Sequence, residues 1–238
     1  MPQGRPGPGQ NRLLAMLPPA SREQLLGVAE RVPLEPLHVL VHYGDPFAHA
    51  YFPLSGVLSL LVLMREGEGA EAAALGFEGL VGAPLLLGGE ASPHEVIVQV
   101  PGEAWRVPAA QLKALLSRDD ALRAVLLRYI EVLLVQTSRN TACNARHEIE
   151  ERLARWLLHM HDWVCVDHLS LTQEFIASML GTRRPTVTIT AGALARAGQI
   201  TYRRGEITIL DRIGLEDAAC EDYPVVREAF EELLPLPA

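Results

Sequence analysis

Residues 171–188, LTQEFIASMLGTRRPTVT, hold two stretches whose apolar residues recur with helical spacing, one on each side of Gly181. The glycine suits the turn between them, because it lacks a Cβ and tolerates left-handed backbone conformations. The second stretch starts at about Arg184 and has Pro185 in its first turn, where the missing N–H costs nothing. Two short β runs then enclose residues 203–206, RRGE, and predict a hairpin. This order predicts a winged helix-turn-helix, which is a DNA-binding unit.

The charge pattern around this unit agrees with a DNA partner. The chain of 238 residues has a net charge of −8, which taken whole argues against nucleic acid. Residues 181–205, however, hold five Arg and no acid, whereas residues 211–238 hold eight acids and two Arg. Because the local field depends on where the charges are, DNA is expected on the basic stretch. An ordinary solvated basic surface, or use of the same unit to bind a protein, is the alternative.

Residues 32–107 have a different sequence pattern, in which short apolar segments alternate with Gly, Pro and Asp. Such spacing predicts an all-β sandwich or barrel. The expected strands are residues 39–42, 50–52, 57–64, 72–75, 96–100 and 104–107, with Ser55-Gly56 and Pro101-Gly102 among the expected turns. The first ten residues carry three Pro and three Gly, and residues 1–11 are predicted to be a disordered tail.

A long helix is predicted between the β-rich part and the helix-turn-helix. After Pro108 neither Gly nor Pro occurs up to residue 162. From Asp119 or Asp120 an apolar stripe recurs over about 25 residues, roughly 37 Å of helix. A helix longer than a small domain is wide usually belongs to a shared interface, although it can also pack on its own sheet. The residues predicted for the dimer interface are Leu122, Leu126, Tyr129, Leu133 and Gln136.

The composition excludes several other classes of protein. The longest apolar stretch, residues 54–64, is half the length of about 20 residues that a membrane-spanning helix needs. The N-terminus shows no apolar signal segment, and the three cysteines are widely spaced, so a reduced, cytoplasmic protein is expected. Three cysteines also exclude a four-cysteine zinc site within one chain.

Residues 171–188 and the hairpin resemble the DNA-binding domain of the cyclic-AMP receptor protein/FNR family of transcription regulators. Gly44-Asp45, residues 51–57 (YFPLSGV), residues 79–82 (GLVG) and the long helix follow the order of that family's β-barrel sensor domain and dimer helix. The resemblance spans about residues 12–215. It implies a homodimer that reads a two-fold symmetric DNA site and contacts RNA polymerase.

The resemblance also implies which residues contact DNA. Arg184 matches the family's base-reading Arg, with Arg183 beside it, and Gln173, Thr186 and Arg203 fall at positions of phosphate contacts. Thr188 and Arg204 complete the predicted DNA-binding set. Two departures matter: Pro185 stands where the family often has Glu, and Ile189 replaces an Arg. The family's best-known half-site, TGTGA, is therefore not assumed.

The predicted effector pocket consists of Gly82, Ala83, Ser92 and His94. In the family, a Gly-Glu step and a downstream Arg hold the ribose and the phosphate of a cyclic nucleotide. Here the step is Gly82-Ala83, and no Lys or Arg occurs between Arg65 and Trp105. A buried phosphate without a cation is costly, so cyclic AMP is not expected to bind in the usual mode. No cofactor is predicted, and the effector stays unknown.

Alternative functions are a cupin-like, metal-dependent β-barrel enzyme or a haem- or redox-sensing member of the same regulator family. The enzyme would use His38, His42, His49 and Glu78, and haem would use His94 or His42. No catalytic residue is assigned, and the protein is expected not to be an enzyme.

No metal site is predicted either. A second group of His, Cys and Asp side chains, residues 159–168, has two histidines only two positions apart, which point about 200° apart on a helix. Cys143, near the end of the long helix, is expected to be an inert buried thiol, or to pair with its copy in a second subunit.

The sequence thus predicts an α+β protein. Its parts are a tail (1–11), a jelly-roll, cyclic-nucleotide-binding-like β-barrel sensor domain (12–118), a dimerisation helix (119–144), a winged helix-turn-helix DNA-binding domain (145–212) and an acidic helical extension (213–238) of unknown role.

Overall fold

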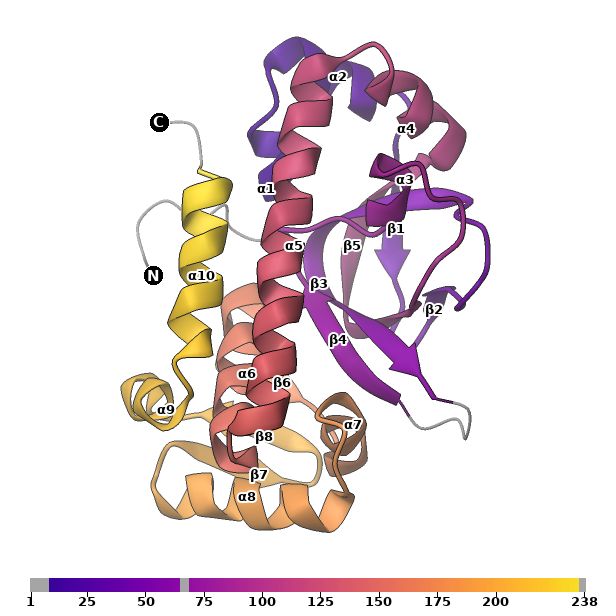
Figure 1. Ribbon diagram of the computed structural model, residues 1–238. Helices are drawn as coiled ribbons and strands as arrows, with labels where there is room; N and C mark the ends of the chain where they lie inside the picture. The colour runs from indigo at the N-terminus through magenta and orange to yellow at the C-terminus, as the bar shows by residue number, and fades with distance from the viewer. Residues whose placement is uncertain (1–8, 65–68, 236–238) are drawn as a thin grey trace.

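The computed structural model describes residues 9–64 and 69–235. It confirms the α+β class and the predicted order of a β-rich sensor domain, a long helix and a winged helix-turn-helix (Figure 1). Residues 1–8 of the predicted tail lie outside the described residues. Residues 9–11 are packed, contrary to the prediction: the Gly9 amide donates to the Leu54 carbonyl at 2.8 Å, and Asn11 is buried. In the described ranges, the helices are too short or too polar to cross a membrane.

One antiparallel sheet forms the sensor domain, and two short helices, α1 (Arg12–Ala15) and α2 (Pro19–Leu26), precede it. Its strands are β1 (Glu30–Leu34), β2 (Val39–Val41), β3 (His49–Leu63), β4 (Gly69–Leu75) and β5 (Glu95–Pro108), with helix α3 (Ala83–Leu86) between β4 and β5. The strand order is β1-β5-β3-β4, and β2 also pairs with β5. Within the described residues this sheet stays open rather than closing into the predicted barrel.

Two segments expected to be turns lie inside long strands. Ser55-Gly56 falls within β3 and Pro101-Gly102 within β5, and the register of β3 on β5 shifts on both sides of Ser55. Gly56 has a φ of +80°, and a Cβ at Gly102 would lie 2.3 Å from the Ser55 carbonyl oxygen. Both glycines therefore allow a bulge and a close backbone approach between paired strands, which local composition does not distinguish from a turn.

Helix α4 (Ala109–Leu116) leads to α5 (Asp120–Arg146), the long helix. The side chain of Asp119 caps α5 by accepting from the Leu122 amide at 2.9 Å. Most of the stripe assigned to a dimer interface is instead buried in its own chain: Leu122, Leu126, Tyr129 and Gln136 are buried, and Leu133 is half-buried. Gln136 donates to the Ala74 carbonyl of β4 at 2.9 Å. That prediction was wrong for these buried side chains, because they pack α5 within its own chain, against β4, α10 and the short helices.

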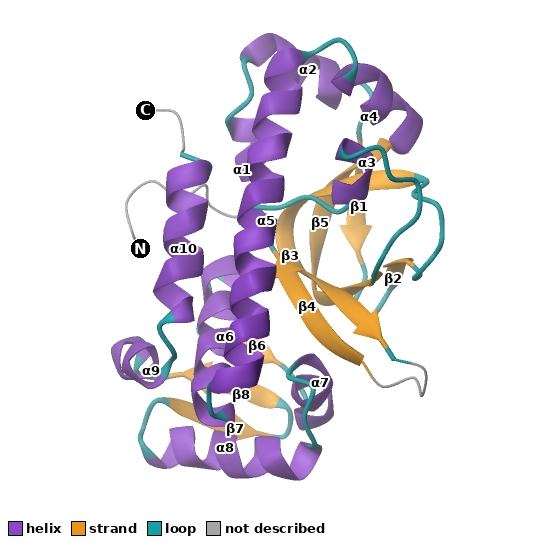
Figure 2. Ribbon diagram, in the orientation of Figure 1, coloured by secondary structure: helices purple, strands orange, loops and turns teal. Residues whose placement is uncertain are grey.

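The C-terminal unit has the elements of the predicted winged helix-turn-helix. They are α6 (Ile149–Val164), β6 (His168–Ser170), α7 (Gln173–Met179), α8 (Arg184–Arg196), β7 (Ile200–Arg203) and β8 (Glu206–Ile209). The three strands pair in the order β6-β8-β7. Gly181, with a φ of +58°, makes the turn between α7 and α8. Figure 2 shows α8 lying along the base of the molecule beneath the hairpin strands.

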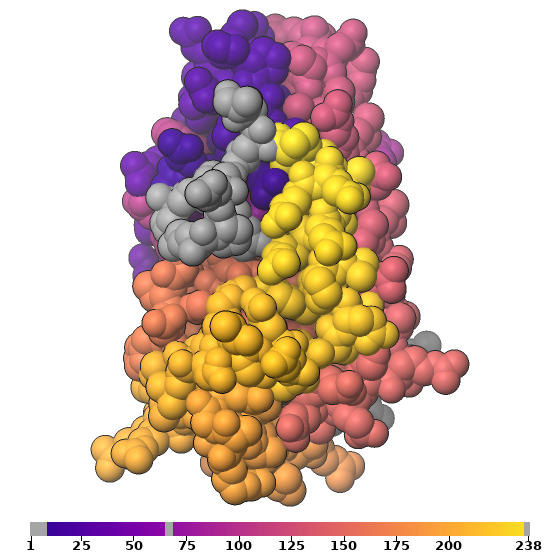
Figure 3. Space-filling model, turned by 90° about the vertical axis from the view of Figure 1, so that its left-hand side faces the viewer, coloured from indigo at the N-terminus to yellow at the C-terminus, as the bar shows by residue number. Residues whose placement is uncertain are grey.

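The acidic extension forms α9 (Arg212–Ala218) and α10 (Asp222–Leu233). Helix α10 packs along α5, and Figure 3 shows this segment, in yellow, running up the face of the molecule toward the indigo N-terminal helices. Its buried side chains Val226, Phe230 and Leu234 belong to the core of the sensor domain. Arg12 of α1 donates through Nε to the Leu234 carbonyl at 2.6 Å. The extension is therefore part of the fold, not a solvated tail.

The sensor domain and the helix-turn-helix unit meet across α6. Trp163 packs against the backbone of Gly76, where a Cβ would lie 2.5 Å from the indole ring. Beside it, the Trp156 indole N–H donates to Glu71 of β4 at 3.1 Å. Glu71 is half-buried at its surface but its carboxyl lies deep in the contact, and this burial raises its pKa to about 7. A titratable group thus lies in the contact between the two parts.

Candidate nucleic-acid interface and effector cavity

Two arginines mark the exposed N-terminus of α8. Arg183 is the N-cap residue, with extended backbone at φ −96° and ψ 146°, and Arg184 is the first helical residue. Both side chains are exposed. Pro185 in the first turn has a backbone geometry preorganised for the helix start. The unpaired amides of a helix N-terminus favour an anion, so this end of α8 adds to the attraction of the two guanidinium groups for phosphate.

The hairpin brings a further basic group to the same place. Arg204 and Gly205 have φ values of +54° and +84°, so they form a two-residue turn of the type that closes tight hairpins. The Gly205 carbonyl accepts from the Leu171 amide at 2.7 Å, which fixes the hairpin tip against the start of α7. Gln173, Arg184 and Arg204 thereby line one surface hollow of about 400 Å³.

The remaining predicted DNA-binding residues surround this hollow. Thr188 donates to the Gln173 side chain at 2.7 Å, which joins α8 to α7. Thr186 lies in the first turn of α8, and Arg203 is exposed at the end of β7. The structure therefore brings the predicted set together around α8 and the hairpin.

Three residues at this surface were not predicted as DNA contacts. Glu174 and Tyr202 also line the hollow. Tyr202 donates to the Leu171 carbonyl at 2.9 Å, and burial raises its pKa to about 12, so it remains a neutral donor. Ile189 is 72% exposed on α8. The sequence held one signal for Ile189: it is an apolar residue among the polar residues on the outer face of α8.

The predicted effector residues also lie together. Gly82, Ala83, Ser92 and His94 line one cavity of about 560 Å³, which α5 closes on one side. Gly82 has a φ of +113° at the start of α3. Among the described residues that line the cavity, none is Lys, Arg, Asp or Glu. Burial lowers the pKa of His94, so this histidine is neutral at pH 7. The cavity is an apolar space without a counter-charge for a phosphate.

The side chains of the enzyme alternative lie in different surroundings. His42 is exposed and pairs with Glu95 at 3.1 Å, whereas Glu78 is buried and pairs with Arg12 at 2.9 Å. The histidines of residues 159–168 also have separate partners: His161 binds Asp167 at 2.8 Å, and His159 stacks on Trp163 with ring centres 5.6 Å apart. These contacts give the side chains structural roles.

Cys143 is buried in its own chain, and so it does not face a second subunit. Its Sγ lies 3.4 Å from the Sγ of Cys220, in the extension. The hydrogen bond with Cys220, together with Arg155 and His147 nearby, lowers the pKa of Cys143 below that of a free thiol. Sequence analysis missed this neighbourhood, although the i, i+4 spacing of Cys143 and His147 was a visible signal for it.

Comparisons with known proteins agree with both parts of this description. A family model of the cyclic nucleotide-binding domain matches residues 31–119, and a model of the Crp-like helix-turn-helix domain matches residues 151–218. The Global nitrogen regulator of Nostoc sp. is 27% identical over 176 residues, 70% of this chain and 78% of the relative. The protein of the same name from Synechocystis sp. is 26% identical over 182 residues, 72% of this chain and 80% of the relative.

Solved structures show the same fold. FixK2 from Bradyrhizobium japonicum has a TM-score of 0.69 at 17% identity, covering 81% of this chain and 98% of that chain. A transcriptional regulator of the CRP/FNR family from Thermus thermophilus has a TM-score of 0.66 at 24% identity, covering 80% of this chain and 98% of that chain. At these identities the likeness concerns the fold alone.

Proposed function

The chain belongs to the cyclic-AMP receptor protein/FNR family of transcription regulators and carries its helix-turn-helix DNA-binding domain, and on that basis we propose that it acts as a cytoplasmic homodimer on two-fold symmetric DNA sites. Promoter-bound copies contact RNA polymerase in this proposal. The observation that carries it is the exposed N-terminus of α8, where Arg184 shares one hollow with Gln173 and Arg204.

Arg184 reads a guanine in this proposal. A guanidinium group can donate two parallel hydrogen bonds to guanine O6 and N7 in the major groove. Arg203 and Arg204 on the hairpin, and Gln173 at the start of α7, hold the flanking phosphates and set the angle of α8 in the groove. Ile189, exposed on the same helix, suits an apolar contact with a thymine methyl group, so the half-site differs from that of a regulator with Arg at this position.

The second copy binds along a different side of α5 from the buried stripe. Leu127 and Leu134 are 42% and 62% exposed, seven residues apart. With Ile130, Thr137 and Thr141 they follow the alternating three- and four-residue spacing of a coiled-coil seam. Ile130, Leu134 and Thr137 also line the effector cavity, so a partner helix on this seam would close the cavity from outside.

An Arg184→Ala variant is expected to bind its DNA site about 5- to 150-fold more weakly per half-site than the wild type, because each bidentate contact with guanine contributes about 1–3 kcal/mol. Selection from a random pool of duplexes supplies the DNA site, and two inverted half-sites about 34–36 Å apart are expected from a dimer. Affinity is measured by fluorescence anisotropy at one fixed salt concentration, since the phosphate contacts are strongly salt-dependent.

Arg118→Ala is the matched control for this measurement. Arg118 is an exposed arginine in the sensor domain, between α4 and α5, so its loss changes the net charge equally but leaves α8 intact. If the Arg184→Ala and Arg118→Ala variants bind the selected site with equal affinity, the proposal that Arg184 on α8 reads the DNA is wrong.

The effector in this proposal is a small uncharged molecule, not a cyclic nucleotide. The cavity offers apolar walls and a neutral His94, and its described lining supplies no cation to a phosphate. Titration calorimetry with cyclic AMP and with cyclic GMP is therefore expected to give no binding heat. Binding of either nucleotide at sub-micromolar concentration would contradict this part of the proposal and leave the DNA-binding part unaffected.

A further inference from the structure

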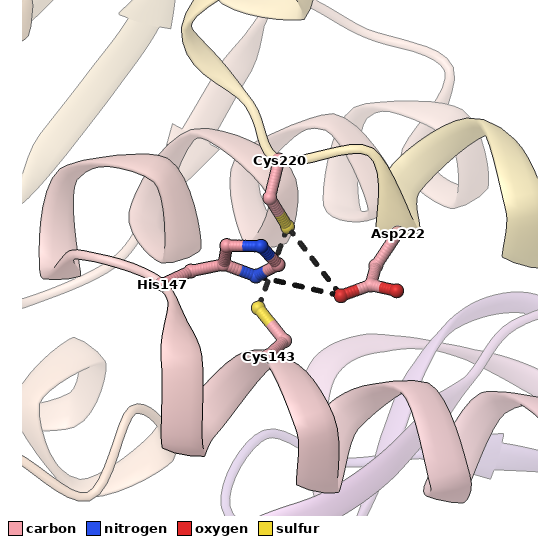
Figure 4. Close-up of side chains that lie close together, drawn as sticks. All are labelled: Cys143, His147, Cys220 and Asp222. Carbon is pink, nitrogen blue, oxygen red and sulfur yellow. Dashed lines mark hydrogen bonds and ion pairs between the residues drawn. The ribbon is translucent and has the colours of Figure 1, made fainter.

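Four side chains of metal-binding type meet where the extension touches the end of α5 (Figure 4). They are Cys143 and His147 from the C-terminal end of α5, Cys220 from the segment that joins α9 to α10, and Asp222 at the start of α10. We call this group the α5–α10 cluster. One ligand atom from each side chain lies within 4.8 Å of all the others. The site is enclosed, because Cys143, Cys220 and Asp222 are 0%, 3% and 2% exposed.

The distances in the cluster are those of a ligand set. The two Sγ atoms are 3.4 Å apart, the Cys220 Sγ is 3.9 Å from Asp222 Oδ2, and Asp222 Oδ2 is 3.5 Å from His147 Nδ1. Zinc bonds of about 2.3 Å to sulfur and 2.0–2.2 Å to nitrogen or oxygen place tetrahedral ligands about 3.3–3.8 Å apart. The side chains therefore already surround a space of the size that such an ion occupies.

Neighbouring residues orient two of the ligands. Glu221 lies 3.1 Å from His147 Nε2, which leaves the buried Nδ1 directed into the cluster. A metal-binding histidine usually has its other ring nitrogen bonded to a carboxylate in this way. Arg139 lies 3.4 Å from Asp222 Oδ1, which leaves Oδ2 directed toward the thiols. Each of these two ligands thus has one atom held outside the cluster and one available inside it.

The charges also suit a divalent cation. Two thiolates and one carboxylate carry three negative charges, a neutral imidazole carries none, and a dication would reduce the total to −1. Arg155, which is buried and acts electrostatically on Cys143, compensates that remaining charge.

We propose that the α5–α10 cluster binds one Zn²⁺ ion. Two thiolates, an imidazole and a carboxylate in tetrahedral spacing favour zinc over magnesium or calcium, which prefer oxygen ligands and higher coordination numbers. Four protein ligands leave no open position, so the ion has a structural role. It ties the C-terminal extension to the last turn of α5, directly before α6 and the DNA-binding unit.

Co²⁺ is the probe for this proposal, because it takes the same tetrahedral geometry and is coloured. The full chain is reduced, stripped of metal with a chelator and titrated anaerobically with Co²⁺. We expect saturation at one ion per chain, with the strong visible bands of tetrahedral Co²⁺ and a sulfur-to-cobalt charge-transfer band. Zn²⁺ should then bleach these bands, because it binds such sites more tightly than Co²⁺.

Substitutions locate the site. Cys220→Ser and Asp222→Asn should abolish or greatly weaken the bands, and Glu221→Gln should weaken Zn²⁺ affinity about 10- to 100-fold through its effect on His147. Cys165→Ser is the control, since Cys165 lies at the end of α6 outside the cluster and its loss should leave the titration unchanged.

The wild-type titration decides the proposal even if a variant fails to fold. A reduced chain that shows no thiolate–cobalt band overturns it. A second result would also overturn it. If Cys143 and Cys220 form a disulfide on mild oxidation, and the reduced chain binds no Co²⁺, the two cysteines are a redox pair and not metal ligands. Binding that persists in both Cys220→Ser and Asp222→Asn places the metal elsewhere and overturns the assignment as well.

Discussion

An Arg12→Met variant is expected to lose about 3–5 kcal/mol of its free energy of unfolding, because the substitution leaves the carboxylate of Glu78 buried without its cation. The two groups are 2.9 Å apart, and each side chain is only 4% exposed. Trp163 of α6 also donates to Glu78 at 3.4 Å, and Arg12 binds the Leu234 carbonyl. One ion pair therefore connects α1, the sensor domain, α6 and the end of α10.

Urea denaturation followed by circular dichroism measures this loss as a lower midpoint. Arg31→Met is the matched control: Arg31 pairs with Glu103, but the two side chains are 53% and 48% exposed, so its loss should cost about 0–1 kcal/mol. A double variant, Arg12→Met with Glu78→Met, should recover most of the stability, because no buried charge remains. If Arg12→Met and Arg31→Met lose the same small amount, the ion pair has no special role.

The stability of the wild type is expected to fall by about 3 kcal/mol as the pH rises from about 4.5 to above 7, through the titration of Glu71. Burial raises the pKa of this carboxyl from its usual value of 4.5 to about 7. Between these two pH values the folded chain keeps a proton that the unfolded chain has already released. Protons therefore favour the folded state, and their loss at higher pH removes that stabilisation.

The hydrogen bonds around Glu71 depend on its protonation, and those that Ser59 and Trp156 donate oppose the rise in its pKa that burial causes. Ser59 Oγ lies 2.7 Å from Glu71 Oε2 and 2.6 Å from Gln99 Oε1, but one hydroxyl has one proton to donate. Because Gln99 donates through its nitrogen to the sulfur of Met160 at 2.9 Å, its oxygen faces Ser59 and can only accept. When Glu71 is protonated it can donate to Ser59, which then donates to Gln99, and when Glu71 is ionised Ser59 donates to it.

Glu71→Gln is the test, since the amide resembles the protonated carboxyl and does not titrate. Its free energy of unfolding should match the wild type at about pH 4 and exceed it by about 3 kcal/mol at pH 8, because the wild type then buries a charge. Other titrating groups cancel in the difference between the two proteins. Parallel stability profiles from pH 5 to pH 8 would show that Glu71 keeps an ordinary pKa.

Much of the fold was predictable because its signals are local. The helix-turn-helix depends on apolar spacing over a few turns, on Gly181 between the helices and on a two-residue hairpin loop, and all three act within about ten residues. That Gly82 and His94 lie together was also predictable, since they fall on loops whose order along the chain resembles a known sensor domain, and both line one cavity. Glycines within strands were misread, because a bulge and a turn call for the same residue.

The amino-acid sequence by itself determined the two parts of the chain, the basic surface at α8 and the hairpin, and the lack of a cation in the cavity beside α5, because charge and periodicity can be read position by position. Only the tertiary structure decided which side of α5 is buried, since one apolar stripe can pack equally well on a sheet or on a partner helix. The tertiary structure also brings together the side chains of the α5–α10 cluster, in which Cys143 and Cys220 are separated by 77 positions along the chain. Packing over such a separation is set by the whole core, and no local pattern encodes it.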